Sequence, residues 1–381
     1  MGLTSKIKGD FALIYMDNAA TTRVLDQGVE QAAKCMSSCY GNPESRHGFG
    51  LRGEQTLQAA RKTLAKAVGV SDEEIFFAPS ATVANNTALR GAVASKRKGR
   101  IISTAFEHPA VEEVLTDLEK TFEVVRLKPR QGVITVDSFR NALSPDTVLV
   151  TCMQVNNETG AVTPLREMVT LLKRSGIDAP FHTDAVQGFL KEDFRYSVVD
   201  MATFAGHKVH GPKGIGALYL KKGLRIKPTV LGGGQEKNLF SGTHNVPAAA
   251  AWACACEIMQ GEKADVRATV ERIHAILREG ILALGGEINS PEGGSPYVLN
   301  AAFPGYLGEN VVNYLSEKEI YISTGSACSA KKPSRVMTAI GKEHLSRNSL
   351  RFSFSRFNTE EEAYTVLQEL KNALNEISKV R

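Results

Sequence analysis

The hydrophobic and polar positions of this 381-residue chain follow two different periods. Short apolar runs are typical of buried strands, and apolar residues spaced by three or four positions are typical of helices. From about Gln55 onward the two patterns alternate, with helix-like stretches such as 165–174 between most of the strand-like runs 75–77, 100–103, 123–127, 147–151, 201–205 and 216–220. This order predicts an α/β fold with a mostly parallel, doubly wound sheet.

A second group of elements follows the long helical stretch 264–284. The chain ends in a predicted helix over 359–380 with its apolar residues on one face. We therefore predict a large domain of residues 16–258 and a smaller α+β domain of residues 1–15 and 259–381. Because no loose linker separates them, the functional site is expected in the cleft between the two domains.

Composition and charge narrow the class of protein. The chain is 43% hydrophobic and 23% charged, and its net charge of +5 is spread along the sequence, so we expect a globular protein without a direct nucleic-acid partner. The longest apolar run, 246–259, is short for a membrane span and contains Glu257, so no membrane association is expected. Since no signal-peptide core follows Met1 and there are only six cysteines, a cytoplasmic location is expected.

Lys208 and Asp184 are the first candidates for chemistry. Lys208 follows the strand-like run 201–205 and precedes a glycine-rich turn, where its amine could be desolvated and form an imine with an aldehyde cofactor. The alternative is a solvated turn lysine. Asp184 ends an apolar strand, where a carboxylate can keep a pyridine nitrogen protonated, although a helix N-cap is also common there. Together the two residues favour pyridoxal phosphate.

Two further segments offer weaker signals. His108 follows a strand-like run and could stack on an aromatic ring, but a lone histidine is more often structural. The segment 80–82 opens a predicted helix, whose N-terminal N–H groups could hold a phosphate group. Serine and threonine also cap helices that bind nothing, so this segment is informative only in combination with the others.

Seven segments occur in the order in which they are found in cysteine desulfurases, which are pyridoxal-phosphate-dependent enzymes of the class V aminotransferase group. The chain resembles that family in 15–22, 40–43, 155–160, 207–214, 241–243, His182-Thr183-Asp184-Ala185-Val186-Gln187 and Gly325-Ser326-Ala327-Cys328-Ser329. The resemblance implies the fold of the fold-type I transferases, a homodimer, pyridoxal 5'-phosphate as cofactor, L-cysteine as substrate and a sulfur-acceptor protein as partner.

The resemblance also implies a role for each matched residue. Lys208 would bind the cofactor as a Schiff base, Asp184 would pair with the ring nitrogen, Gln187 would bond the phenolate oxygen, and His108 would stack on the ring and assist proton transfer. The phosphate group would be bound by Ala81, Thr82, His207 and, from the other subunit, Thr243. The substrate carboxylate would be bound by Asn157 and Arg351, and Asn157 would also contact the cofactor.

Cys328 is the expected sulfur acceptor within the chain. Lys331 and Lys332 lie close to it in sequence, and nearby cations favour the nucleophilic thiolate. The pairs Cys35–Cys39 and Cys254–Cys256 lack a second ligand pair at suitable spacing, so no metal site is expected. Two other functions share the cofactor residues or the cysteine. They are a selenocysteine lyase or aminotransferase of the same fold, and a sulfur carrier without catalysis.

The chain departs from the family pattern at several positions. Ala205 stands where the family commonly has serine, Phe240 where it has arginine, and Val83 where it has glutamate. The segment from Cys328 to Pro333 is about two residues shorter than in close relatives. We therefore expect weaker binding of the phosphate group and a shorter reach for Cys328.

Overall fold

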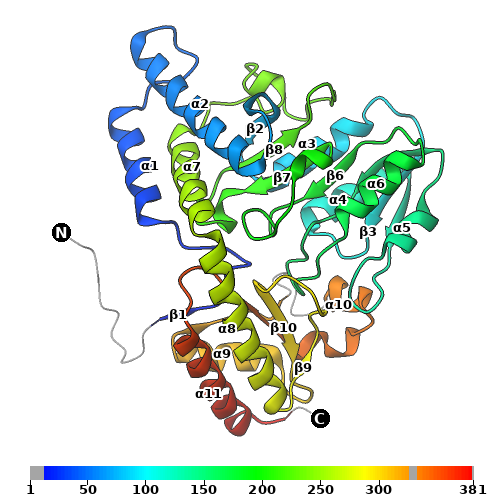
Figure 1. Ribbon diagram of the computed structural model, residues 1–381, viewed down its shortest axis with the longest axis vertical. Coiled ribbons are helices and arrows are strands. Elements are labelled where there is room, and N and C mark those ends of the chain that lie inside the picture. Colours follow the sequence, from blue (N-terminus) through cyan, green and yellow to red (C-terminus); the bar gives the residue numbers. More distant parts are fainter. Residues whose placement is uncertain (1–12, 326–332, 380–381) are drawn as a thin grey trace.

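A seven-stranded sheet forms the centre of the molecule in the computed structural model, which describes residues 13–325 and 333–379 (Figure 1). Neighbouring strands are parallel except at β8, which is antiparallel to β2 and β7. The mostly parallel α/β sheet predicted from the sequence is therefore confirmed. The strands, in their order across the sheet, are β2 (Ile75–Ala78), β8 (Gly216–Leu220), β7 (Met201–Ala205), β6 (Phe181–Asp184), β5 (Thr147–Thr151), β3 (Arg100–Thr104) and β4 (Glu123–Leu127).

Helices cover both faces of this sheet, because alternate strand residues point to opposite sides. Phe77 belongs to one buried cluster, which includes residues of α2, α5, α6 and α7. Phe76 belongs to another, which includes residues of α3 and α4. Helix α1 packs against α7 beyond the edge of the sheet (Figure 1). The helices are α1 (Asp26–Ser38), α2 (Gly48–Val68), α3 (Ala81–Val93), α4 (Pro109–Leu118), α5 (Val136–Ala142), α6 (Leu165–Arg174) and α7 (Val246–Gly261).

The C-terminal part of the chain builds a separate hydrophobic core on an antiparallel sheet, β12-β10-β9. Ile14 and Met16 from the start of the described chain are buried in this core, and β1 pairs in parallel with β11. The exact boundaries at residues 16 and 258 stay a prediction. The elements are β1 (Ile14–Tyr15), α8 (Lys263–Ala283), β9 (Glu287–Ile288), β10 (Val298–Ala302), α9 (Gly308–Glu317), β11 (Ile320–Tyr321), α10 (Arg335–Ala339), β12 (Ser349–Ser353) and α11 (Glu360–Glu376).

The segment 17–23 connects the two cores. Ala19 N donates to Ser353 Oγ at 2.8 Å on the side of the small sheet. Thr22 N donates to His207 O at 2.9 Å on the side of the large sheet. Residues from opposite ends of the chain therefore meet at this segment. Within residues 13–325 and 333–379, no helix has the length and apolar character needed to cross a membrane.

Candidate active site

The carboxyl ends of β6 and β7 bring Asp184 and Lys208 to one edge of the large sheet. Asp184 is the last residue of β6, and Lys208 ends the 3-10 helix Gly206–Lys208 that follows β7. The two strands are hydrogen-bonded neighbours in parallel register. His108 is the N-cap of α4, which follows β3, and the charges of Asp184 and Lys208 both act on its pKa. The structure therefore brings these three predicted residues together at the edge where parallel α/β sheets bind ligands.

Lys208 has an unusual environment for a lysine. Its Nζ donates to Ala19 O at 2.6 Å and to Ala20 O at 2.7 Å. Burial lowers the pKa of Lys208 to about 7, and the nearby cations Lys191 and Arg351 act in the same direction. An amine with this pKa is neutral in a large fraction of molecules at neutral pH, and the neutral amine is the nucleophile in imine formation.

Asp184 and Gln187 lie buried beside Lys208. Asp184 Oδ2 accepts a hydrogen bond from Asn85 Nδ2 at 2.8 Å, and Asp184 Oδ1 accepts one from Val186 N at 3.0 Å. Gln187 Nε2 donates to Ala19 O at 2.8 Å, while Gln187 Oε1 is buried without a hydrogen-bond partner. Asn85 was missed by the sequence prediction. The sequence around it gave no distinct signal, because Asn86 and Thr87 follow it directly in the helix after the phosphate turn.

His108 caps the N-terminus of α4. Its Nδ1 accepts a hydrogen bond from Ala110 N at 3.1 Å, which orients the ring. Partial burial lowers the pKa of His108; Asp184 opposes the shift, and Lys208 and Arg335 add to it. The residue remains exposed enough to offer its ring to a ligand.

Glu107, next to His108, is a buried carboxyl group that the sequence prediction also missed. Burial raises the pKa of Glu107 to about 8. Its Oε1 accepts hydrogen bonds from Thr104 Oγ1 at 2.6 Å and Met153 N at 2.8 Å, and its Oε2 has no partner. No sequence pattern distinguishes this glutamate from a solvated one, because its burial depends on β5 and α4 packing around it.

The predicted phosphate residues Ala81 and Thr82 are the first two residues of α3. The first N–H groups of a helix lack partners within the helix and attract anions. Gly216 on β8 lies directly against this helix end, because a Cβ at that position would be 2.7 Å from Ala81 N. His207 Nδ1 is 3.2 Å from Thr21 Oγ1, and burial lowers the pKa of His207 to about 4.

The three residues that depart from the family pattern are buried or partly buried. Ala205 and Phe240 are buried, and Phe240 packs in the same hydrophobic cluster as Phe76. Val83 packs partly buried against this cluster. These three positions offer apolar side chains where a hydroxyl, a guanidinium and a carboxylate are common in the family, so they contribute no polar side chain to the site.

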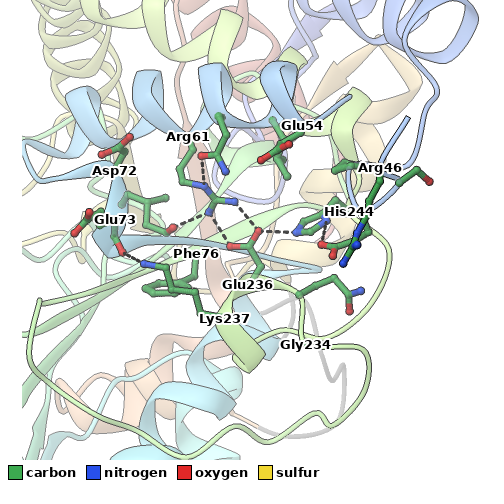
Figure 2. A pocket seen from close by; sticks show the side chains of 17 residues that line it. Arg46, Glu54, Arg61, Asp72, Glu73, Phe76, Gly234, Glu236, Lys237 and His244 are labelled. Atoms are coloured by element: carbon green, nitrogen blue, oxygen red, sulfur yellow. Dashed lines mark hydrogen bonds and ion pairs between the residues drawn. The ribbon is translucent and has the colours of Figure 1, made fainter. Parts of the chain in front are cut away.

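Thr243 is exposed, and its hydroxyl forms no hydrogen bond within the described chain. The segment 234–244, which carries Thr243, borders a cavity of about 730 Å³ and is held in place by Glu236 (Figure 2). Glu236 accepts two hydrogen bonds of 2.7 Å from Arg61 and one of 2.9 Å from Phe77 N, and His244 Nε2 lies 3.1 Å from Glu236 Oε1. These contacts hold the segment against α2 and β2.

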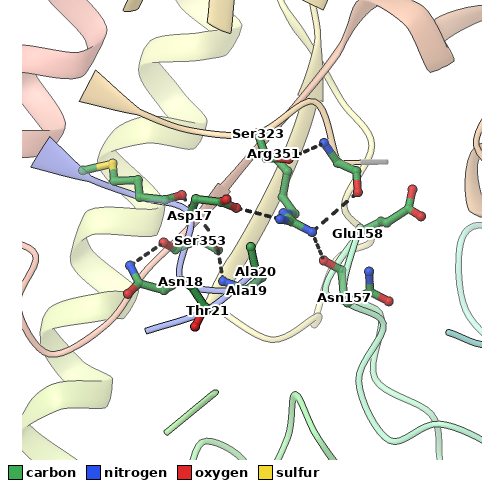
Figure 3. A network of polar contacts seen from close by, with 12 residues as sticks. Asp17, Asn18, Ala19, Ala20, Thr21, Asn157, Glu158, Ser323, Arg351 and Ser353 are labelled. Carbon is green, nitrogen blue, oxygen red and sulfur yellow. Dashed lines mark hydrogen bonds and ion pairs between the residues drawn. The ribbon is translucent and has the colours of Figure 1, made fainter. Parts of the chain in front are cut away.

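Arg351 and Asn157 meet beside Asp17, at the start of segment 17–23 (Figure 3). Arg351 is buried on β12, and its Nη1 donates to Asn157 O at 3.1 Å. Its Nη2 donates to Asp17 Oδ1 at 2.6 Å. The structure therefore brings the two predicted carboxylate-binding residues together, and it adds Asp17, which the sequence prediction did not assign.

Cys328 lies outside the described residues, so its predicted role stays a prediction. The described residues on each side of its segment adjoin the carboxylate site. Gly325 O accepts a hydrogen bond from Arg351 Nη1 at 3.5 Å. Ser334 Oγ donates to Glu158 Oε2 at 2.5 Å, next to Asn157.

Known proteins with similar sequences and structures identify the family of this chain. Residues 14–366 match the family model described as aminotransferase class-V. The cysteine desulfurase IscS of Methanosarcina thermophila is 37% identical, covering 93% of this chain and 90% of that protein. A solved structure described as a NifS-like protein matches with a TM-score of 0.91 at 35% identity, covering 96% of this chain and 100% of that one. Another, described as SspA in complex with cysteine, has a TM-score of 0.79 at 31% identity, covering 91% and 100%. The chain therefore belongs to the class V aminotransferase family, and within it to the cysteine desulfurases.

Proposed function

We propose that this chain holds pyridoxal 5'-phosphate on Lys208 and removes sulfur from L-cysteine, which leaves L-alanine and a persulfide on Cys328. The observation that carries the proposal is a desolvated lysine beside a buried carboxylate at one edge of a parallel sheet. Lys208 has a pKa of about 7, and Asp184 ends the neighbouring strand. The family match and the names of the relatives support the same activity.

The residues at this edge fit a phosphorylated pyridine aldehyde. The Asp184 carboxylate is held in place by Asn85 and Val186 N, as a partner of a ring nitrogen would need to be. Gln187 Nε2 donates one N–H to Ala19 O, and its second N–H is available for the phenolate oxygen. The N-terminus of α3 supplies N–H groups for a phosphate. When bound, this cofactor supplies an electron sink for the substrate's α-carbon.

Side chains of the protein carry out substrate binding, proton transfer and sulfur transfer. Arg351 and Asn157 bind the substrate carboxylate, and Lys208 moves the proton at the substrate Cα. The Cys328 thiolate attacks the substrate sulfur, so that a sulfur–sulfur bond forms while the substrate Cβ–S bond breaks. Cβ takes up a proton and is reduced, the transferred sulfur is oxidised, and L-alanine leaves. No external oxidant is needed, and the persulfide is passed to an acceptor protein.

Two variants test the two halves of the proposal. Lys208→Ala is expected to lose turnover and the visible absorbance that borohydride bleaches. Cys328→Ala is expected to keep that absorbance and to lose sulfide release, while mass spectrometry of the wild type after exposure to L-cysteine finds one added sulfur on Cys328. Cys39→Ala is the matched control, because Cys39 is a half-buried cysteine at the end of α1. Full sulfide production by Cys328→Ala would contradict the assignment of the nucleophile.

We further propose that the enzyme is a homodimer in which Thr243 binds the phosphate group in the neighbouring subunit. The exposed hydroxyl and the firm anchoring of its segment by Glu236 support this role. Thr243→Ala is expected to weaken cofactor binding about tenfold, as loss of one hydrogen bond to a charged group implies. Light scattering is expected to report two copies; a monomer that binds the cofactor with full affinity would rule out the shared site.

A further inference from the structure

Backbone pairing determines that Asp17 lies beside Arg351. Asp17 pairs with Ser353 of β12 in a parallel bridge, and Ser353 N donates to Met16 O at 2.7 Å. Ser353 and Arg351 are two positions apart on the same strand, so their side chains point to the same face of the sheet. The register that places Asp17 at Ser353 therefore also places its carboxylate at the guanidinium of Arg351 (Figure 3).

The three nitrogen atoms of the Arg351 guanidinium have different hydrogen-bond partners. Nη2 donates to Asp17 Oδ1 at 2.6 Å, and Nη1 donates to Asn157 O at 3.1 Å and to Gly325 O at 3.5 Å. Nε is buried and has no partner. A carboxylate binds a guanidinium with two parallel hydrogen bonds, either through Nη1 and Nη2 or through Nε and Nη2. Both arrangements include Nη2, which is the nitrogen that Asp17 occupies.

We infer that Asp17 competes with the substrate carboxylate for Arg351 and so sets how strongly the site binds α-amino acids, an inference that rests on the proposed role of Arg351. Either the substrate displaces Asp17 from Nη2, or two carboxylates share one buried cation. In both cases the negative charge of Asp17 opposes binding of the substrate carboxylate. Asp17 acts through Arg351 and is a specificity-determining residue of the site.

The competition has a structural reason. The Arg351 side chain is 4% exposed and the Asp17 side chain is 23% exposed. A buried guanidinium without a counter-ion is costly, so Asp17 stabilises the cation while the site holds no substrate. The partly exposed carboxylate of Asp17 can regain hydration when it leaves Nη2, whereas Arg351 exchanges one carboxylate for another. A ligand with an anionic group such as a carboxylate can drive this exchange, whereas a simple amine cannot.

The test compares two competitive inhibitors of the holoenzyme that differ only in the carboxylate, L-alanine and ethylamine. Asp17→Asn is expected to raise the preference for L-alanine over ethylamine about tenfold, the factor that corresponds to 1.4 kcal/mol. The KM for L-cysteine is expected to fall by a similar factor, and kcat is expected to change less. Asp17→Glu keeps the charge and is expected to keep the wild-type preference. An unchanged or smaller preference in Asp17→Asn would overturn the inference.

Arg351→Gln separates this inference from the proposed function. It is expected to abolish the preference for L-alanine; if the preference remains, Arg351 is not the carboxylate site and the proposed role of Arg351 fails together with the inference. If Arg351→Gln abolishes the preference and Asp17→Asn leaves it unchanged, the inference alone fails. Asp17→Ser is a second neutral variant in case Asp17→Asn does not fold. A crystal structure of the wild type with L-alanine gives an independent result, because the ligand carboxylate is expected on Nη2, and a carboxylate bound elsewhere would refute the inference.

Discussion

The stability of Glu107→Gln relative to the wild type is expected to rise with pH. Burial raises the pKa of Glu107 from 4.5 to about 8; hydrogen bonds from Thr104 and Met153 N oppose the rise, and the charge of Asp184 adds to it. The folded protein therefore binds a proton at Glu107 that the unfolded chain releases above its ordinary pKa. Glutamine keeps the shape and the acceptor oxygen but needs no proton, so its contribution to stability does not depend on pH.

The size of the effect follows from the linkage between proton binding and folding. The contribution of Glu107 to the free energy of unfolding is fully present below pH 4.5 and is lost as the pH rises toward about 8. At pH 7 the loss is on the order of 3 kcal/mol, since each pKa unit corresponds to about 1.4 kcal/mol. With an unfolding entropy of about 2 cal/mol/K per residue over 381 residues, this corresponds to a shift of roughly 4 °C in melting temperature. At pH 5 the gain is expected to be below about 1 kcal/mol.

Thermal melting of the wild type and Glu107→Gln between pH 5 and pH 8 measures this difference. The control is Glu113→Gln, which changes an exposed glutamate on α4, the helix that begins two residues after Glu107, and is expected to leave the melting temperature nearly unchanged at every pH. A difference between Glu107→Gln and the wild type that is constant or shrinks as the pH rises would refute the reasoning.

Three further outcomes are expected. Glu236→Gln removes the charge that pairs with buried Arg61, so it is expected to lower the free energy of unfolding by about 3 kcal/mol or more, measured by denaturant titration. Gly216→Ala is expected to weaken cofactor binding in a fluorescence titration, because its Cβ would clash with Ala81 N at 2.7 Å. In the cofactor-free enzyme, the rate at which Lys208 forms an imine with added pyridoxal phosphate is expected to rise with pH and level off above about 7. A rate that keeps rising toward pH 10 would contradict the lowered pKa of Lys208.

Local pattern predicted most of the regular structure. Strand β7 and helix α6 have the predicted bounds 201–205 and 165–174, because β7 buries one continuous run and α6 buries one face, and both patterns are visible in their own residues. The final helix ends at Glu376 instead of residue 380. The prediction did not identify α1 (Asp26–Ser38), which has few buried residues and packs on α7 beyond the sheet edge. The antiparallel direction of β8 could not be predicted from its own residues either, because the direction of a strand depends on how the chain turns back at 211–214.

The sequence by itself determined the chemistry of the site: which residues carry an amine, a carboxylate, a guanidinium or a thiol, and that Asp184 and Lys208 lie at or just after the ends of strands in one mostly parallel sheet. Only the tertiary structure decided how these groups are tuned. The contact of Asp17 with Arg351 joins residues 334 positions apart. The pKa values of Lys208 and Glu107 depend on desolvation by elements distant in sequence. Hydrophobic periodicity reports what one segment buries, whereas charge pairing and desolvation depend on which other segments surround it.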